Sequence, residues 1–212
     1  TGYERPGNAG DNMAGTAQST EVLVIGSGFG ALALGHALNS AGRNDYIIIE
    51  KAAQPGGVWR DNTYPGCACD VPSRFYSFSF EQDWPWSSRF GQQKEILDYF
   101  NHCIDKYNVR SHVRCNVAVQ SAAWDNDAAL WRVETTAGAY EARVLVSAVG
   151  LFNQAILPDI PGRDTFSGAS WHSSQWDHSI DLKGKRIAAI GTGASAIQYV
   201  PELAKLAGQL YV

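Results

Sequence analysis

The 212-residue sequence predicts an α/β fold in which one local arrangement occurs twice. At residues 21–31, and again at 185–196, a short aliphatic run leads into a glycine-rich turn and then into a helix-forming segment. A strand, a tight glycine turn and a helix together form the opening of a Rossmann-like dinucleotide-binding unit. Two such openings predict two Rossmann-like dinucleotide-binding domains, and we expect the second to be truncated within this sequence.

The composition favours a folded protein that binds small molecules. Hydrophobic residues make up 45%, charged residues 18%, and the formal net charge is −4. Because Lys and Arg do not cluster, we expect neither nucleic acid nor a membrane as a partner, and the apolar runs are too short to span a bilayer. The four cysteines lack a disulfide-dense spacing and the start shows no signal-peptide pattern, so we expect a cytoplasmic location.

Residues 1–20 differ from the remainder of the chain. They are rich in Gly, Asn, Thr and Ser and contain almost no large aliphatic side chains. Such a segment buries too little apolar surface to offset the entropy of ordering, so we expect a flexible N-terminal lead-in. Met13 is either a start residue or an internal one, and the sequence does not decide between them.

The first unit, residues 21–150, opens with a predicted strand at 21–25, a turn at 26–31 and a helix at 32–42. A second buried strand follows at 45–50. The spacing of apolar residues places the inner side of the helix on Leu32, Leu34, Ala37 and Leu38.

The first turn carries the features that a dinucleotide requires. Gly26 permits the tight turn, Gly28 lets the backbone approach a pyrophosphate, and the helix N-terminus presents unpaired N–H groups to it. Ala31 stands at the third glycine position, with Gly30 as an extra glycine. Glu50 ends the second strand about twenty residues on, where an acid binds the ribose hydroxyls and favours FAD or NAD over a 2′-phosphate.

The first unit continues with elements that cover the nucleotide domain. A helix is predicted at 94–107, with Ile96, Leu97, Phe100, Ile104 and Tyr107 on one stripe. Alternating segments then predict strands at 113–124, 130–136 and 141–150, which form a β-meander insertion.

A connector and a second turn follow. Residues 151–184 form a predicted interdomain linker, and 185–212 begin a second domain with a strand at 185–190, a helix at 195–208 and a further strand from 209. Gly191 and Gly193 occupy the turn, and Ala196 stands at its third glycine position. Two such turns on one chain indicate FAD in the first and a nicotinamide nucleotide in the second.

Residues 56–70 carry a longer motif, and through it the chain resembles the single-chain flavin-dependent Baeyer–Villiger monooxygenases that use FAD and NADPH. Their N-terminal motif requires Gly or Ala, Gly, any residue, Trp, four residues, an aromatic, Pro, Gly, three residues and Asp. The matching residues here are Gly56, Gly57, Trp59, Tyr64, Pro65, Gly66 and Asp70.

A second motif of the same family lies in the linker, with Phe166, Gly168, His172, Trp176 and Asp177 at the required spacing. Related flavin N-oxygenases share the Phe, Gly and His but usually lack the closing Trp–Asp. A lone histidine beside tryptophans is otherwise most often a packed or surface residue. The resemblance implies instead that His172 helps to couple the FAD and NADP domains and does not transfer protons.

The resemblance implies a reaction in which NADPH reduces FAD, O2 adds to give a flavin peroxide, and the peroxide converts a ketone into an ester or lactone. Asp70 and His172 are the expected catalytic residues, and Asp70 pairs with an arginine. In the family, that arginine lies in sequence that would follow Val212. The same holds for the basic residues that bind the NADPH 2′-phosphate and for most of the substrate pocket. We therefore expect this chain to need the remainder of the same polypeptide beyond Val212.

The resemblance also implies which residues contact each cofactor. Those expected at FAD are Gly26, Gly28, Phe29, Gly30, Glu50, Gly57, Val58, Trp59, Asp70, Tyr76 and Val119. Those expected at NADPH are Ala68, Cys69, Asp70, Thr192, Gly193, Ala194, Ser195 and Gln198. We expect no metal, because Cys67 and Cys69 have no second Cys or His pair nearby in sequence.

Two alternatives stay open. A related flavin monooxygenase would oxygenate nitrogen or sulfur and would not need the Asp–Arg pair. The 212 residues on their own would otherwise be a non-catalytic FAD-binding module.

Overall fold

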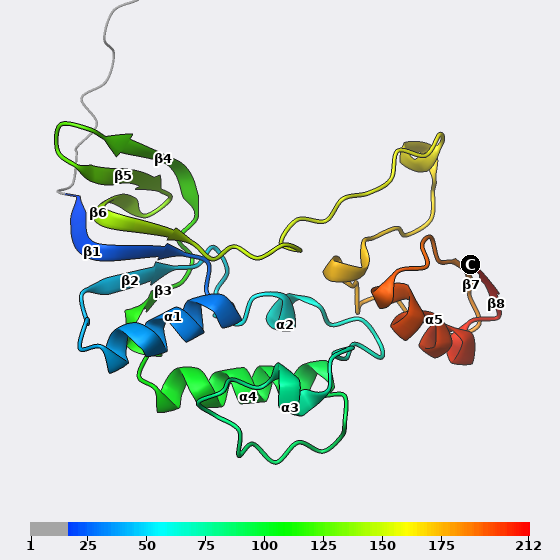
Figure 1. The fold of residues 1–212 in the computed structure, drawn as a ribbon. Coiled ribbons are helices and arrows are strands. Elements are labelled where there is room, and N and C mark those ends of the chain that lie inside the picture. Colours follow the sequence, from blue (N-terminus) through cyan, green and yellow to red (C-terminus); the bar gives the residue numbers. More distant parts are fainter. Residues whose placement is uncertain (1–16) are drawn as a thin grey trace, which may run out of the picture.

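The computed structural model describes residues 17–212 and confirms the α/β class. A six-stranded sheet with two main helices on one face is joined by a long extended segment to a smaller α/β unit (Figure 1). The strand order is β3-β2-β1-β6-β5-β4. The strands are β1 (Gln18–Ile25), β2 (Tyr46–Ile49), β3 (Val113–Arg114), β4 (Val119–Asp125), β5 (Leu130–Thr135) and β6 (Gly138–Ser147).

The centre of the sheet is parallel and its edge is the predicted meander. Strand β1 pairs in parallel with β2 and β6, and β2 with β3, whereas β6, β5 and β4 pair in antiparallel. The prediction of a single strand at 113–124 is wrong, because the segment forms two separate strands, β3 and β4. Asn116, between the two strands, has a φ of 59°, which lies outside the extended region. Strands β3 and β4 then form opposite edges of the sheet.

Alternation along β1 and β2 divides the core between the two faces of the sheet. Val24 and Ile48 face the helices α1 (Phe29–Ser40) and α4 (Gln93–Lys106). Leu23 and Ile49 face the other way and pack with residues of the meander, which include Val133, Tyr140 and Ala142. Because successive side chains of a strand point to opposite faces, a continuous aliphatic run is what a sheet covered on both faces requires.

The burial of the two main helices differs in detail from the prediction. In α1, Ala37 is exposed, and the chain instead packs closely at Gly35, where a Cβ would lie 2.6 Å from Val109 Cγ1. In α4, Ile96, Phe100 and Ile104 are buried as predicted, together with Tyr99 and Cys103. Side chains that carry a polar group can also lie in the buried stripe, because the tertiary structure supplies hydrogen-bond partners for that group.

The start of the sheet corrects one boundary. Strand β1 begins at Gln18, which pairs with Tyr140, so residues 18–20 belong to the sheet and the lead-in predicted at 1–20 is too long. Thr20 is buried and donates to Asp45 Oδ1 over 3.0 Å. Residues 1–16 of the predicted lead-in, with Met13, lie outside the described residues.

The smaller unit repeats the strand, turn and helix of the first. Strand β7 (Arg186–Ala188) leads through the second glycine turn into α5 (Ala194–Leu206), and β8 (Gln209–Tyr211) pairs with β7 in parallel. The segment between the units contains the short helices η2 (Arg163–Thr165) and η3 (Ser173–Gln175). Three further short helices are α2 (Val58–Asp61), α3 (Ser73–Tyr76) and η1 (Arg110–His112).

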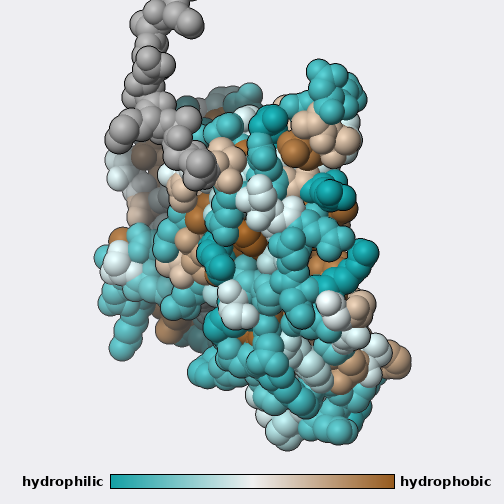
Figure 2. All heavy atoms as spheres, turned by 90° about the vertical axis from the view of Figure 1, so that its left-hand side faces the viewer, coloured by the Kyte–Doolittle hydropathy of each residue, from teal (hydrophilic) through white to brown (hydrophobic). Residues whose placement is uncertain are grey.

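The face on the six-stranded-sheet side of the molecule is mainly hydrophilic, with apolar residues interspersed among polar ones (Figure 2). Within the described part of the chain, no helix is both long and apolar enough to cross a lipid bilayer.

We expect Tyr99→Phe to lower the free energy of unfolding by about 2–4 kcal/mol, because two backbone groups would lose their partner. The Tyr99 side chain is fully buried, its hydroxyl accepts from the Phe78 N–H over 2.8 Å, and it donates to the Glu81 carbonyl over 2.9 Å. Urea denaturation of the full-length protein measures the change. Tyr211→Phe, at a half-exposed position, is the matched control and should change stability little.

Candidate nucleotide-binding sites

The first glycine turn connects β1 to α1 and fixes its own geometry. Gly26 donates to the Ile49 carbonyl over 2.8 Å and has a φ of +92°. A Cβ at this position would lie 2.7 Å from the Ala148 carbonyl oxygen. Gly28 then precedes the first residue of α1 and accepts from the Leu32 N–H. Only glycine fits at Gly26, and the N–H groups of the first turn of α1 have no partner within the helix.

A second glycine pair faces this turn. The Gly56 N–H donates to the Ser27 carbonyl over 3.1 Å, and Gly57 has a φ of +56°. A Cβ on Gly57 would lie 3.1 Å from Gly28 Cα. The backbones of the two turns therefore touch without side chains between them. This is the cradle that a dinucleotide pyrophosphate needs, because its oxygens bind backbone N–H groups at close range.

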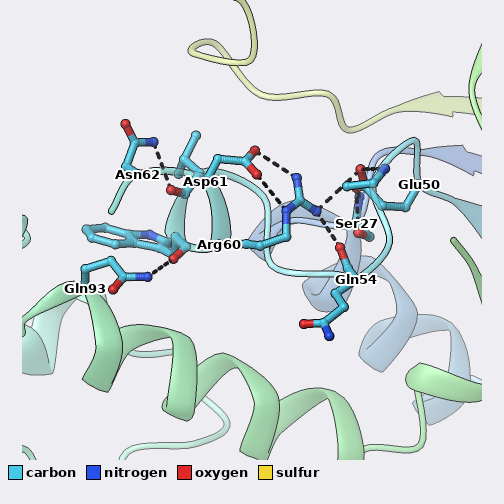
Figure 3. Close-up of polar contacts among 10 residues, drawn as sticks. Ser27, Glu50, Gln54, Arg60, Asp61, Asn62 and Gln93 are labelled. Carbon is cyan, nitrogen blue, oxygen red and sulfur yellow. Dashed lines mark hydrogen bonds and ion pairs between the residues drawn. The ribbon is translucent and has the colours of Figure 1, made fainter. Parts of the chain in front are cut away.

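Glu50 lies beside the first turn (Figure 3). The residue is 5% exposed, and its Oε2 accepts from both the N–H and the hydroxyl of Ser27 over 3.1 and 2.7 Å. Oε1 accepts from the Ala52 N–H over 2.9 Å. A carboxylate has about four lone-pair sites, so these three hydrogen bonds hold Glu50 in place and leave capacity for a ligand hydroxyl.

Arg60 is a residue of this site that the sequence did not single out. Its guanidinium Nη1 lies 3.5 Å from Glu50 Oε1, while Nε and Nη2 form a bidentate pair with Asp61 over 2.7 and 2.8 Å (Figure 3). Burial by itself would lower the pKa of Arg60, but the two carboxylates raise it on balance. Arg60 occupies one of the four variable positions of the motif, so motif spacing carried no signal for it.

Trp59 and Tyr76 form the far side of the cradle. Trp59 is buried and its indole N–H donates to the Tyr76 hydroxyl over 2.7 Å. The Tyr76 ring packs 5.5 Å from that of Phe29, at the start of α1. Burial raises the pKa of Tyr76, so its phenol stays protonated at neutral pH. Val58 packs partly buried in the same region.

The loop at residues 64–70, named the motif loop below, runs between the two units. Tyr64, Cys67 and Cys69 are buried, and Asp70 is exposed. Burial raises the pKa of both thiols, which keeps them neutral and unreactive. Among residues 17–212, no group of three or more His, Cys, Asp and Glu side chains is arranged to hold a metal ion.

The second glycine turn lies at the start of α5. Gly191 has a φ of +116°, and Gly193 precedes the helix. Thr192, Gly193 and Ala194 are exposed and Ser195 is partly buried, so the first turn of α5 is open to a ligand. The predicted residue Gln198 lies one turn further on, and its side chain reaches the motif loop.

The linker motif forms a compact turn against both units. His172 Nδ1 accepts from the Ser174 N–H over 3.1 Å and so caps η3, which contacts α2 of the first unit. Trp171 packs on Trp176 at 5.7 Å between ring centroids, and Trp176 packs on Tyr199 of α5 at 5.6 Å. The cluster of Trp171, His172 and Trp176 therefore bridges α2 and α5.

The structure thus divides the predicted residues into two groups. Phe29, Glu50, Gly57, Trp59 and Tyr76 gather around the first turn, with Gly26, Gly28 and Gly30 in the turn or at the start of α1. Val119 is the first residue of β4. Two residues before it, the Val117 N–H donates to the Glu50 carbonyl. Thr192 to Ser195 form the second group, and the motif loop with Ala68, Cys69 and Asp70 lies between them.

Residues 23–212 match one protein-family model, which is described as pyridine nucleotide-disulphide oxidoreductase. A Baeyer–Villiger monooxygenase of Streptomyces coelicolor is 48% identical over 186 residues, which cover 88% of this chain and 36% of that protein.

Solved structures agree with the sequence comparison. Cyclohexanone monooxygenase from Rhodococcus sp. Phi1 bound to NADP+ is 37% identical with a TM-score of 0.85, over 92% of this chain and 38% of that one. OTEMO in complex with FAD and NADP is 35% identical with a TM-score of 0.86, over 93% and 39% of the respective chains. The chain thus spans less than two fifths of the length of these relatives. It belongs to the pyridine nucleotide-disulphide oxidoreductase family and, as its two motifs predicted, is similar to Baeyer–Villiger monooxygenases.

Proposed function

We propose that this chain is the nucleotide-binding part of an NADPH-dependent flavin monooxygenase that inserts one oxygen atom of O2 next to a ketone carbonyl, giving an ester or lactone. The observation that carries the proposal is the position of the motif loop. Tyr64 and Ala68 of this loop bind Gln198 of α5, the helix that begins at the second glycine turn, and Asp70 follows Ala68 by two residues. The similarity to cyclohexanone monooxygenase supports the same assignment.

In this proposal FAD binds the first unit, at 21–150, and NADPH binds the second, which begins at 185, with 151–184 as the linker. The contact between Gly28 and Gly57 supports it, because a diphosphate requires a backbone surface free of side chains. The chemistry that bound FAD would supply is acceptance of hydride from NADPH and activation of O2. Glu50 would hold the adenosine ribose, and Trp59 and Tyr76 would border the flavin ring.

Asp70 would act as a positioning anion. It is exposed on the motif loop, so it is open to a cationic side chain from elsewhere in the longer polypeptide. Such a pair orients the cation toward negative charge that develops during oxygen transfer. The substrates in this proposal are a small ketone and O2. We also propose a cytoplasmic location, which the four free cysteines support.

An assay of the full-length protein tests the reaction class. Purified protein is supplied with FAD, NADPH and O2 and with cyclic, linear and aryl ketones beside amines and sulfides. Ester or lactone formed in step with NADPH consumption would support the proposal. N-oxide or sulfoxide as the sole product would replace it with a heteroatom oxygenase, and bound FAD without substrate-dependent NADPH consumption would leave only a nucleotide-binding module.

We expect His172→Ala to leave FAD bound while lowering the yield of ester per NADPH consumed, because η3 loses its cap and its packing against α2 loosens. Product formation and hydrogen peroxide release are measured together with flavin content. His172→Asn is the informative partner, because asparagine also caps helix starts. Restored coupling in His172→Asn would assign the capping bond as the function of this residue, and unchanged coupling in His172→Ala would refute a role in coupling.

A further inference from the structure

The Gln198 side chain binds the backbone of the motif loop. Its Nε2 donates to the Ala68 carbonyl over 2.8 Å, and its Oε1 accepts from the Ala68 N–H over 3.2 Å. The same Oε1 accepts from the Tyr64 hydroxyl over 2.9 Å. These bonds join residues 130 and 134 positions apart in the chain, one from α5 and the others from the motif loop.

The backbone N–H and C=O of Ala68 need such a partner. On one side, the Cys69 N–H donates to Gly91 and the Cys67 carbonyl accepts from Gln93, which forms an isolated antiparallel bridge between Ala68 and Gln92. Backbone groups of an extended chain alternate in direction, so the N–H and C=O of Ala68 point away from this bridge. A primary amide carries the same donor and acceptor as a peptide group. Gln198 therefore completes the pairing as a neighbouring strand would.

The surrounding contacts show that the helix and the loop are closely packed. A Cβ on Gly66 would lie 2.8 Å from the Gln198 carbonyl oxygen and 3.1 Å from Glu202 Cγ, so only glycine allows this approach. The rings of Tyr64 and Tyr199 are 6.0 Å apart, and both are buried. Hydrogen bonds in such a water-poor interface are strong, and their loss leaves backbone groups without partners.

We propose that Gln198 is a positioning residue that couples the motif loop to the second nucleotide site. Its Oε1 accepts two hydrogen bonds and its Nε2 donates one, all three to the motif loop, so we assign its effect to the placement of Ala68. The inference rests on the proposed function in one respect: the turn at the start of α5 binds the nicotinamide nucleotide. Asp70 follows Ala68 by two residues, so nucleotide binding at α5 and the placement of Asp70 become linked.

The first test is hydrogen exchange of the motif loop in the full-length protein. In Gln198→Ala we expect the Ala68 amide to exchange at least about ten times faster than in the wild type, because its acceptor is removed. This readout requires no catalysis. An unchanged exchange rate in a folded Gln198→Ala variant would overturn the proposal.

Gln198→Glu adds a readout that a general packing defect does not give. A protonated carboxyl offers one donor and one acceptor and so replaces the amide. The ionised form cannot donate to the Ala68 carbonyl, and its second oxygen repels that carbonyl oxygen, which separates the motif loop from α5. We expect fast exchange at pH 8 and slower, wild-type-like exchange near pH 5, after correction for intrinsic rates. Gln209→Glu, at an exposed position of β8, is the matched control and should show no such pH dependence. Equal behaviour of the two variants would overturn the proposal.

Nucleotide titration links the contact to function. The change in flavin absorbance on addition of NADP+ reports binding, and we expect Gln198→Ala to bind NADP+ about tenfold more weakly with the FAD content unchanged. Faster exchange with unaltered NADP+ affinity would overturn the coupling. Failure of the full-length protein to oxidise any ketone would count against the proposed function alone, because neither readout depends on it.

Discussion

Gly26→Ala should lower the free energy of unfolding of the full-length protein by about 2–5 kcal/mol and prevent FAD binding. The residue has a φ of +92°, which side chains with a Cβ rarely adopt, and that Cβ would lie 2.7 Å from the Ala148 carbonyl oxygen. That carbonyl is backbone at the end of β6, so it cannot move without disturbing the pairing of β6 with β1. Thermal unfolding and the FAD content of the purified protein measure both effects.

Gly30→Ala is the matched control for this prediction. It lies four residues further on, within α1, and a Cβ there would meet no heavy atom within 4 Å. Alanine is favoured over glycine inside a helix by about 1 kcal/mol, so stability should stay equal or rise. If both variants lost the same stability, steric crowding at Gly26 would not be the cause.

Glu50→Gln should weaken FAD binding by about 10- to 100-fold, since a hydrogen bond to a charged group contributes about 1.5–3 kcal/mol. The carboxylate of Glu50 accepts from Ser27 and Ala52 on both oxygens, and an amide presents a donor to one of these N–H groups. The ribose would lose its anionic acceptor, and the side chain would lose its fixed orientation. Titration of FAD into the apoprotein, followed by flavin fluorescence, gives the dissociation constant.

The control for this substitution is Glu134→Gln, which makes the same chemical change at an exposed position of β5. Its FAD affinity should equal that of the wild type. Arg60 keeps its bidentate pair with Asp61 in the Glu50 variant, so the protein should remain folded. An FAD affinity for Glu50→Gln within twofold of the wild type would show that Glu50 only supports the loop.

Most of the first site could be predicted from the sequence because its residues are close along the chain or are fixed by motif spacing. The strand at 21–25, the glycine turn and Glu50 form one βαβ unit, whose geometry is local and right-handed. Burial within α4 was also predictable from its helical period. The split of residues 113–124 was not, because it depends on which strand each half pairs with.

The roles of Arg60, Gln198 and His172 could not be predicted from residue type. Arg60 meets Glu50 only because the fold brings α2 close to the residue that follows β2. The Gln198 amide binds a loop 130 residues earlier in the chain. The spacing of the linker motif marked His172, but its bond to Ser174 and the position of η3 against α2 come from the structure.

The sequence by itself determined the fold class, the two glycine turns and the two motifs, since each depends on neighbouring residues or on a fixed spacing. Tertiary structure alone decided how the two units meet. Tyr64 and Gly66 pack against α5, and Gln198 pairs with a free backbone edge at Ala68. Contacts of this kind depend on where a side-chain donor and acceptor arrive in space, and no local periodicity in the chain records that.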